Sequence, residues 1–174
     1  ALLFYPGYGG KSVMDMSQYS EEQIRSIRRG ALIAASLTAF LSPFMGSSVN
    51  VALPDIGQDF KMGAVLLGWV NLAFLLVSAS MAIPFGRLGD IWGRKRFFMA
   101  GLAVFTLASV WIALAWTGPL LIAGRAMQGV GSAMITATGM AILISVFPPE
   151  KRGKVLGINV AAVYLGLSAG PFIG

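Results

Sequence analysis

The sequence predicts an all-α integral membrane protein whose chain crosses the bilayer five times. With 56% hydrophobic and only 11% charged residues, the chain is too apolar to cover a water-facing surface. The mean hydropathy of +0.76 indicates the same class of protein. The apolar residues also form runs that are separated by short charged stretches, which is the pattern of a multi-pass chain.

Each apolar run is close to the roughly 20 residues that a helix needs to cross a hydrocarbon core of about 30 Å. Backbone polar groups inside lipid must bond within their own segment, so the runs are expected to be helices. Strands would alternate in polarity, and these runs do not. The expected spans cover residues 31–53, 64–85, 97–116, 119–147 and 155–174.

Composition also excludes several functions. The chain contains no cysteine and no histidine, which removes disulfides, thiol catalysis and most zinc sites. We therefore expect no metal site, no cofactor and no enzyme activity. The net charge of +6 does not indicate nucleic acid, because the cations lie in short connections between spans and not on one continuous face.

The stretch before the first span is expected to have two parts. We interpret residues 1–20 as a disordered leader or tail, in which Met14 or Met16 could be the natural start. Ser20 and Gln23 fit a capping box, with acidic residues in the first turn, so a helix is expected to begin at about Glu21.

Residues 21–30 are then expected to form a cytoplasmic juxtamembrane helix that continues into the first span. Its arginines would meet anionic lipid headgroups at the membrane surface. The remaining chain, residues 31–174, would hold the five spans of a partial N-terminal bundle.

The charged connections predict the orientation. With alternating spans, almost all cations fall on one side, and the only cation on the other side is Lys61. Short basic connections stay in the cytoplasm, so we expect a cytoplasmic N-terminus in the cell membrane and Gly174 near the outer face. The cations on the expected cytoplasmic side are Arg25, Arg28, Arg29, Arg87, Arg94, Lys95, Arg96, Lys151, Arg152 and Lys154.

The densest charge cluster is the stretch GRLGDIWGRKRF at residues 86–97, which we expect to be a water-exposed turn between the second and third spans. Basic charge alone would fit a simple topogenic loop. The spacing is more specific, because it resembles the GxLxDxxGRK signature of major facilitator transporters between their second and third helices. The resemblance implies a gating latch on the cytoplasmic side, whose partner lies in a second bundle. The matching residues are Gly86, Asp90, Gly93, Arg94 and Lys95.

The first span carries several polar residues near its end. Ser47, Ser48 and Asn50 could form interhelical hydrogen bonds or line a solute path, and the sequence leaves both interpretations open. The run MGSSVNVALPDI resembles a signature of the multidrug branch of major facilitator antiporters. That signature carries an aspartate where this chain has Met45.

The fourth span contains Arg125, the only strongly ionisable side chain inside any expected span. A guanidinium in hydrocarbon costs at least about 2.5–3.5 kcal/mol, so we expect it to face the bundle interior and find acceptors. The alternative is that it snorkels to the outer boundary. Gln128 lies one turn along, and RAMQGVGSA resembles the family's fourth-helix signature. That resemblance implies that Arg125 and Gln128 face the central cavity and that Arg125 is linked to proton transfer.

Small residues recur in the last two spans. The series Gly129, Ala133, Ala137 and Ala141 is expected to be a packing stripe. The last span matches the Gx8Gx3GPxxG pattern of the antiporter members of the family, and we expect its glycines to present a flat face to a neighbouring helix. The matching residues are Gly157, Gly166, Gly170, Pro171 and Gly174.

The resemblance implies a parent with two bundles of six helices, of which this chain would be an N-terminal fragment. We expect the parent to export small amphipathic solutes or drugs by proton-coupled antiport, with lipid, the solute, protons and the remaining helices as partners. No carboxylate lies within the expected spans, so the titrating acid would be elsewhere in the parent, unless Asp55 reaches the outer mouth. The alternatives are a symporter or uniporter of the same fold, and a truncated membrane module that does not transport.

Overall fold

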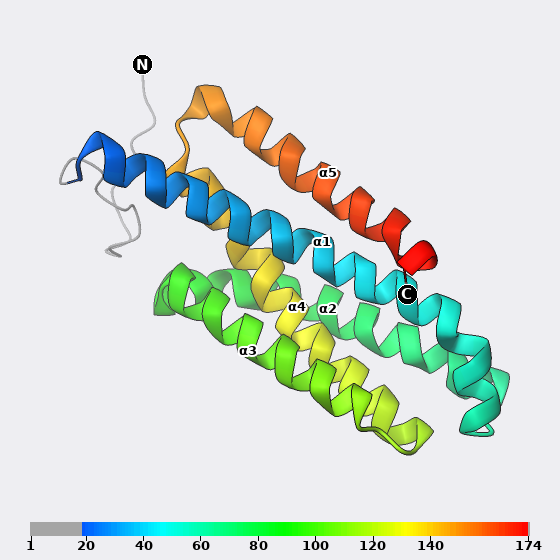
Figure 1. The fold of residues 1–174 in the computed structure, drawn as a ribbon. Coiled ribbons are helices and arrows are strands. Elements are labelled where there is room, and N and C mark those ends of the chain that lie inside the picture. The colour runs from blue at the N-terminus through cyan, green and yellow to red at the C-terminus, as the bar shows by residue number, and fades with distance from the viewer. Residues whose placement is uncertain (1–18, 174) are drawn as a thin grey trace.

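The computed structural model describes residues 19–173, which form five helices and contain no strand. All five helices are long and apolar enough to cross a membrane, which confirms the all-α membrane fold (Figure 1). The helices are α1 (Glu21–Asp59), α2 (Ala64–Trp92), α3 (Arg94–Ala113), α4 (Gly118–Val146) and α5 (Pro149–Ile173).

The first helix begins where the capping box predicts. The Ser20 Oγ accepts from the Gln23 backbone N–H at 3.3 Å, and the Ser20 N–H donates to Gln23 Oε1 at 2.9 Å. The helix then continues without a break for 39 residues, through Pro43 and Pro54. The expected juxtamembrane segment and the first span are therefore one helix, and the leader up to residue 18 lies outside the described residues.

The water-exposed turn expected at residues 86–97 is much shorter than predicted. Gly86 and Asp90 lie inside α2, and α3 begins at Arg94, so that Gly93 alone separates the two helices. Gly93 has a φ of +95°, a conformation that only glycine adopts without strain. A helix can continue in water after it has left the hydrocarbon, which is why α2 includes Gly86 and Asp90. The positive φ of Gly93 then lets the chain reverse direction with a single non-helical residue.

Two other connections are also more helical than expected. Asp55 lies in the last turns of α1 and not in an outer loop, because α1 continues to Asp59. Lys151 and Lys154 lie in the first turns of α5, which begins at Pro149 with Glu150 in its first turn. A proline and an acidic residue at a helix start favour this early beginning.

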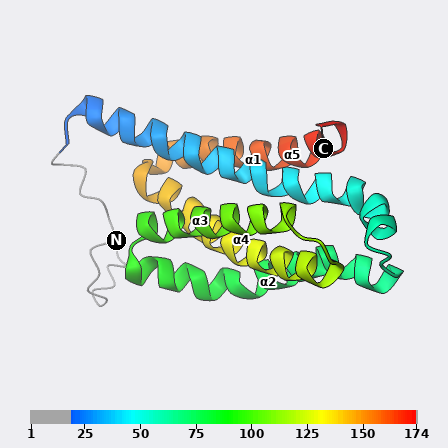
Figure 2. The same ribbon diagram turned by 60° about the horizontal axis from the view of Figure 1, so that its bottom comes forward.

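The fourth helix is the centre of the molecule. In its most apolar 18-residue window 56% of residues are buried, against 22% or less in the other four helices. It packs along both α2 and α3, whereas α1 packs mainly along α5 (Figures 1 and 2). The cavity described below lies where the α1 and α5 pair meets α2 and α4.

Small residues on α4 explain how closely its neighbours approach. A Cβ at Gly129 would lie 2.7 Å from the Phe74 carbonyl oxygen of α2, and a Cβ at Gly131 would lie 2.6 Å from the Phe105 nitrogen of α3. Ala133 is 1% exposed, so the stripe packs as expected in this half of the helix. Small side chains of this kind let membrane helices approach closely.

The basic ends of the helices lie at one end of the molecule. The start of α1, the junction of α2 with α3 and the connection of α4 to α5 lie together at the left in Figure 1. Three arginines there donate to carbonyls at the end of α4: Arg28 Nε to Val146 at 3.0 Å, Arg94 Nη1 to Ala141 at 3.0 Å and Arg152 Nε to Phe147 at 3.1 Å. They meet the negative end of the α4 dipole.

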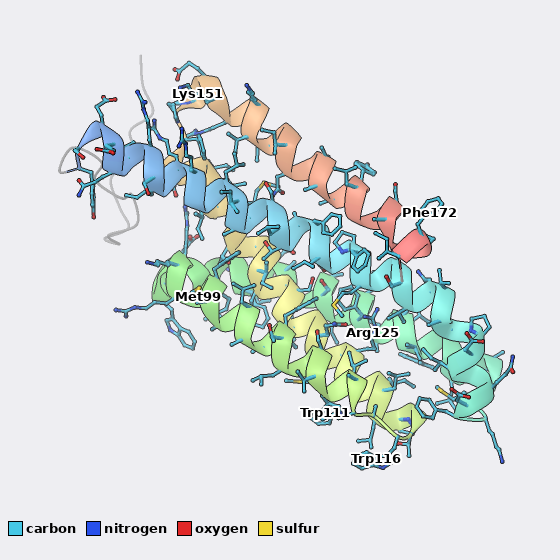
Figure 3. The ribbon with its side chains drawn as sticks, viewed as in Figure 1. Met99, Trp111, Trp116, Arg125, Lys151 and Phe172 are labelled. Carbon is cyan, nitrogen blue, oxygen red and sulfur yellow. The ribbon has the colours of Figure 1, made fainter. Side chains whose placement is uncertain are left out.

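Large apolar side chains cover much of the outside. Leu76, Leu107 and Leu165 are all more than half exposed. Trp111 and Trp116 project outward at the far end of α3 from the basic connections (Figure 3). Such a surface suits lipid or further helices, and tryptophan prefers the membrane interface.

Candidate functional site

A cavity of about 620 Å³ lies among α1, α2, α4 and α5. Its wall combines apolar side chains with neutral polar ones, and its one charged residue among the described part of the chain is Arg125. The polar lining residues are Thr38, Ser42, Ser47, Asn50, Asn71, Arg125, Ser132, Thr136 and Asn159. A cavity of this size and mixed character suits a small organic ligand.

Arg125 is held inside the bundle. Its side chain is 1% exposed, its Nε donates to the Val70 carbonyl at 3.3 Å, and its Nη1 donates to Gln128 Oε1. The Phe74 ring lies 4.7 Å from the guanidinium carbon, within the range of a cation–π contact. Figure 3 shows the side chain among the helices, so the snorkelling alternative does not describe its position.

Gln128 extends this network to α3 and α1. It is also 1% exposed, and its Nε2 donates to Ser109 Oγ at 2.9 Å. The same Nε2 lies 3.6 Å from the Met45 sulfur. Met45 is uncharged, and its thioether is only a weak hydrogen-bond acceptor. The signature that the run MGSSVNVALPDI resembles has an aspartate at the same position.

Asn71 joins Arg125 to the first helix. Arg125 Nη2 donates to Asn71 Oδ1 at 3.5 Å, and Asn71 Nδ2 donates to Asn50 Oδ1. Sequence reasoning identified Asn50 as a lining residue but missed Asn71. The available signal was a lone amide inside the apolar run at residues 64–85, where a polar group needs a partner.

A second polar group, which sequence reasoning also missed, lies farther along the cavity. Ser42 of α1 and Ser132 of α4 share a hydrogen bond of 3.0 Å. The Thr136 hydroxyl donates to the Ser132 carbonyl at 2.8 Å, and Asn159 Nδ2 of α5 donates to the Ala35 carbonyl at 3.1 Å. All of these side chains belong to the polar lining, so the cavity has polar groups near both ends.

The serines at the end of the first span make interhelical bonds. Ser47 Oγ donates to the Leu167 carbonyl of α5 at 2.9 Å. Ser48 Oγ donates to the Phe44 carbonyl in its own helix at 2.9 Å and lies 3.5 Å from the Gly170 carbonyl. Of the two interpretations, packing holds for both serines, while Ser47 and Asn50 also line the cavity.

The glycines of the last signature are not equivalent. A Cβ at Gly166 would lie 2.1 Å from the Phe40 carbonyl oxygen, and one at Gly170 would lie 2.5 Å from Ser47 Cβ, so these two glycines form the close contact with α1. Gly157 has no neighbouring atom within 4 Å of such a Cβ. Pro171 is exposed in the last turn of α5, and Gly174 lies outside the described residues.

The residues of the first signature lie at the basic end, away from the cavity lining. Arg94 Nε and Asp90 Oδ1 form an ion pair of 2.8 Å across Gly93. Lys95 is exposed, and a Cβ at Gly86 would meet no atom within 4 Å. The structure therefore separates the predicted site residues into a basic end, a cavity and a contact between α1 and α5.

Nothing in the described residues suggests a metal site. No group of three or more aspartates and glutamates lies close enough together to hold an ion among residues 19–173. What the arrangement can do chemically is enclose a ligand and offer it hydrogen bonds.

Comparisons with known proteins agree with this geometry. The family model described as Major Facilitator Superfamily matches residues 35–174. The chain is 36% identical to the riboflavin transporter RibZ of Clostridioides difficile, over 82% of the chain and 31% of that protein. It is 35% identical to the cephamycin export protein CmcT of Amycolatopsis lactamdurans, over 94% of the chain and 34% of that protein. The multidrug resistance protein 3 of Bacillus subtilis is 32% identical over 92% of the chain and 30% of its own length.

A solved structure has the same fold. The crystal structure of a bacterial homolog of the human lysosomal transporter Spinster, in an inward-facing and unoccupied conformation, matches with a TM-score of 0.73 at 24% identity. The match covers 80% of this chain and 29% of that one. The chain thus spans about a third of the length of the curated relatives it matches.

Proposed function

This chain belongs to the Major Facilitator Superfamily, and from that premise we propose that its helices are the first five of a transporter that exports small amphipathic solutes by alternating access. The family is one of transporters and not of enzymes. Members with two bundles would bind the solute between them, near the middle of the membrane.

The observation that carries the proposal is the cavity with Arg125 in its wall. An ionisable side chain that is fully buried in a membrane bundle marks a functional path more often than a structural contact. Here it is surrounded by neutral acceptors from α2 and α4 and not by a carboxylate. We assign Arg125 and Asn50, which line the cavity, to the polar part of the solute path, and Gln128 to the buried network that holds Arg125 in place.

The basic end supports a role in gating. Arg94 joins Asp90 of α2 to the Ala141 carbonyl of α4, so a movement of α2 relative to α4 would have to break one of these bonds. Gly93 is the one non-helical residue between α2 and α3, so we propose that a change of the angle between these helices occurs there. We propose that Asp90, Arg94 and Lys95 form the cytoplasmic latch, with a partner in the remaining helices of the parent.

The contact of α1 with α5 supports a role as a seal. At Gly166 and Gly170 the α5 backbone lies directly against α1, which leaves no room for water or solute between the two helices. We propose that this contact limits leak while other helices move.

Proton coupling would use Arg125 and Gln128 only indirectly. Arginine does not give up its proton in proteins, and no carboxylate lines the cavity among the described residues. We propose that the titrating carboxylate belongs to another part of the parent. We assign the N-terminus to the cytoplasmic side of the plasma membrane, because the basic ends of the helices lie together and short basic connections stay in the cytoplasm.

The test is a flux measurement on the full-length parent in proteoliposomes. Riboflavin and a cephamycin are the first solutes to try, because relatives carry those names. Uptake that stops when an ionophore collapses the pH gradient would support proton antiport. Uptake that is insensitive to that collapse would favour a uniporter, or a symporter driven by another ion.

The last alternative is a truncated module that associates with other helices and moves nothing. The measurement that bears on it is transport by the 174-residue chain alone, set beside transport by the parent. If this chain transports as fast as the parent, the assignment to part of a larger transporter fails. If it inserts without transport while the parent transports, the assignment stands.

A further inference from the structure

We infer that the Asn50 side chain is a hydrogen-bond donor for the solute, polarised by Arg125 through Asn71, and that the cavity selects solutes with a carbonyl, carboxylate or phenolate over permanent cations. The inference rests on the proposed function, because it names the solute class of the same cavity. Neither the role of Asn71 nor this selectivity follows from the sequence signatures.

The chain of hydrogen bonds has a direction that chemistry determines. A guanidinium has only donors, so Asn71 must present its carboxamide oxygen to Arg125. The amide nitrogen of Asn71 is then left to face Asn50, which must accept through Oδ1. The Asn50 NH2 group is therefore the free end of the chain, whichever way the amides are drawn.

The burial of the three residues differs in a way that matters for a ligand. Arg125 is 1% exposed, so a solute cannot touch its guanidinium. Asn71 is half-buried and Asn50 is exposed, and both line the cavity. Among the described residues the Asn50 side chain makes one hydrogen bond, which its Oδ1 accepts from Asn71, so its Nδ2 group is free to donate to a solute.

Aligned hydrogen bonds polarise one another where the local dielectric constant is low. The positive charge of Arg125 strengthens Asn71 as a donor, and Asn71 in turn strengthens Asn50. The solute therefore meets a neutral amide, Asn50, whose strength as a hydrogen-bond donor is raised by the buried Arg125.

The rest of the lining indicates the chemistry of the solute beyond the group that accepts from Asn50. Phe74, Leu75 and Ile135 provide apolar wall for an aromatic or aliphatic body. No aspartate or glutamate of residues 19–173 lines the cavity, so no negative side chain there offsets the repulsion between the buried Arg125 charge and a quaternary cation in the cavity. A solute with an acceptor at one end and an apolar body fits both features.

The test compares two dyes on the purified full-length parent: fluorescein, which carries a carboxylate and a phenolate, and ethidium, a permanent cation of similar size. Affinity is measured by fluorescence anisotropy in detergent, and flux is measured in proteoliposomes. The wild-type parent is expected to bind fluorescein at least about tenfold more tightly than ethidium.

Three variants break the chain of hydrogen bonds at two positions. Asn50→Leu removes the free donor, and Asn71→Leu removes the relay. Asn71→Asp is nearly isosteric and still accepts from Arg125, but it cannot donate to Asn50. Each is expected to weaken fluorescein binding about tenfold and to leave ethidium binding unchanged or tighter. Gln58→Leu, which removes an exposed amide of α1 outside the cavity, is the matched control and should keep the preference.

Several outcomes would overturn the inference. They are a wild-type parent that binds ethidium as tightly as fluorescein, an Asn50→Leu variant with unchanged fluorescein affinity, and an equal loss of both dyes in the folded Asn71→Asp variant. The melting temperature of each variant establishes that it is folded. If the parent binds fluorescein more tightly than ethidium but transports no solute, the proposed function fails and this inference stands. If the parent transports solute but binds the two dyes equally well, this inference fails and the proposed function stands.

Discussion

Gly166 and Phe40 lie so close together that a Cβ at residue 166 would be 2.1 Å from the Phe40 carbonyl oxygen. The carbonyl belongs to the α1 backbone and cannot rotate away as a side chain could. Gly170 makes a similar approach to Ser47 four residues later. This line of contact lets α5 pack directly against α1, where the Ser47 Oγ to Leu167 carbonyl bond adds to it.

Gly166→Ala is therefore expected to push the two helices apart. Overpacking of this kind typically costs about 1–3 kcal/mol, and the parent should melt at a lower temperature. Gly157→Ala is the matched control, because its Cβ would meet no atom within 4 Å and alanine favours helix more than glycine does. Equal melting temperatures for the two variants would show that the contact does not stabilise the bundle.

Arg125→Lys keeps the positive charge but loses the planar fork that reaches three partners at once. Gln128 and Asn71 would each lose their bond to the guanidinium, and we expect solute flux by the parent to fall about tenfold or more. Arg96→Lys, at an exposed site of α3, is the control for the same chemical change. Wild-type flux in Arg125→Lys would remove Arg125 from the transport path.

Asp90→Asn tests the latch. The ion pair with Arg94 is largely exposed, with the Asp90 side chain 55% accessible, and exposed pairs contribute at most about 1 kcal/mol. Membrane insertion and melting temperature should therefore change little, whereas flux should fall several-fold. Glu150→Gln removes a negative charge at the same end of the molecule and should leave flux unchanged. A role limited to folding would show the reverse: a lowered melting temperature with normal flux per folded protein.

A substitution of Arg28 tests whether the arginines that bond to carbonyls at the end of α4 stabilise the fold. Its Nε bonds to the Val146 carbonyl, which lies 118 residues away, and it meets the negative end of the helix dipole. Arg28→Ala is expected to lower the free energy of unfolding by about 1–2 kcal/mol. Arg29→Ala removes the same charge from the next, exposed position and should have little effect. The comparison is made by thermal melting of the two variants, and no difference between them would exclude this capping role.

The sequence was sufficient for the five helices of the described residues, for the position of the basic helix ends at one end of the bundle and for the burial of Arg125. These features follow from local quantities: the length of an apolar run, the sign of a connection and the cost of a charge in hydrocarbon. The capping box at Ser20 also set the start of α1 correctly, because both of its hydrogen bonds are local.

The sequence was less informative about where helices end in water. Hydropathy reports where a helix leaves the lipid and not where it stops, so Asp55, Asp90 and Lys151 were assigned to connections although they are helical. Only Gly93, with its positive φ, gives the chain a real break at the α2–α3 junction.

The cavity depends on pairings between distant parts of the chain. Asn71 and Ser132 become site residues only because α2 and α4 lie against α1. The lone amide in its apolar run marks Asn71 as a group that needs a partner, but no local pattern says which helix supplies that partner. Similarly, five glycine and proline positions match one signature, but the structure shows that Gly166 and Gly170 make the contact while Gly157 does not.

The account depends most on a bilayer being the solvent of these helices, with the basic ends in the cytoplasm. Because the 174 residues contain no cysteine, single thiols can be placed at exposed Lys61 and Lys95 in a parent whose other cysteines have been replaced. A membrane-impermeant maleimide on intact cells should label Lys61→Cys and should reach Lys95→Cys only after permeabilisation. Labelling of Lys95→Cys from outside intact cells, with Lys61→Cys protected, would contradict the account.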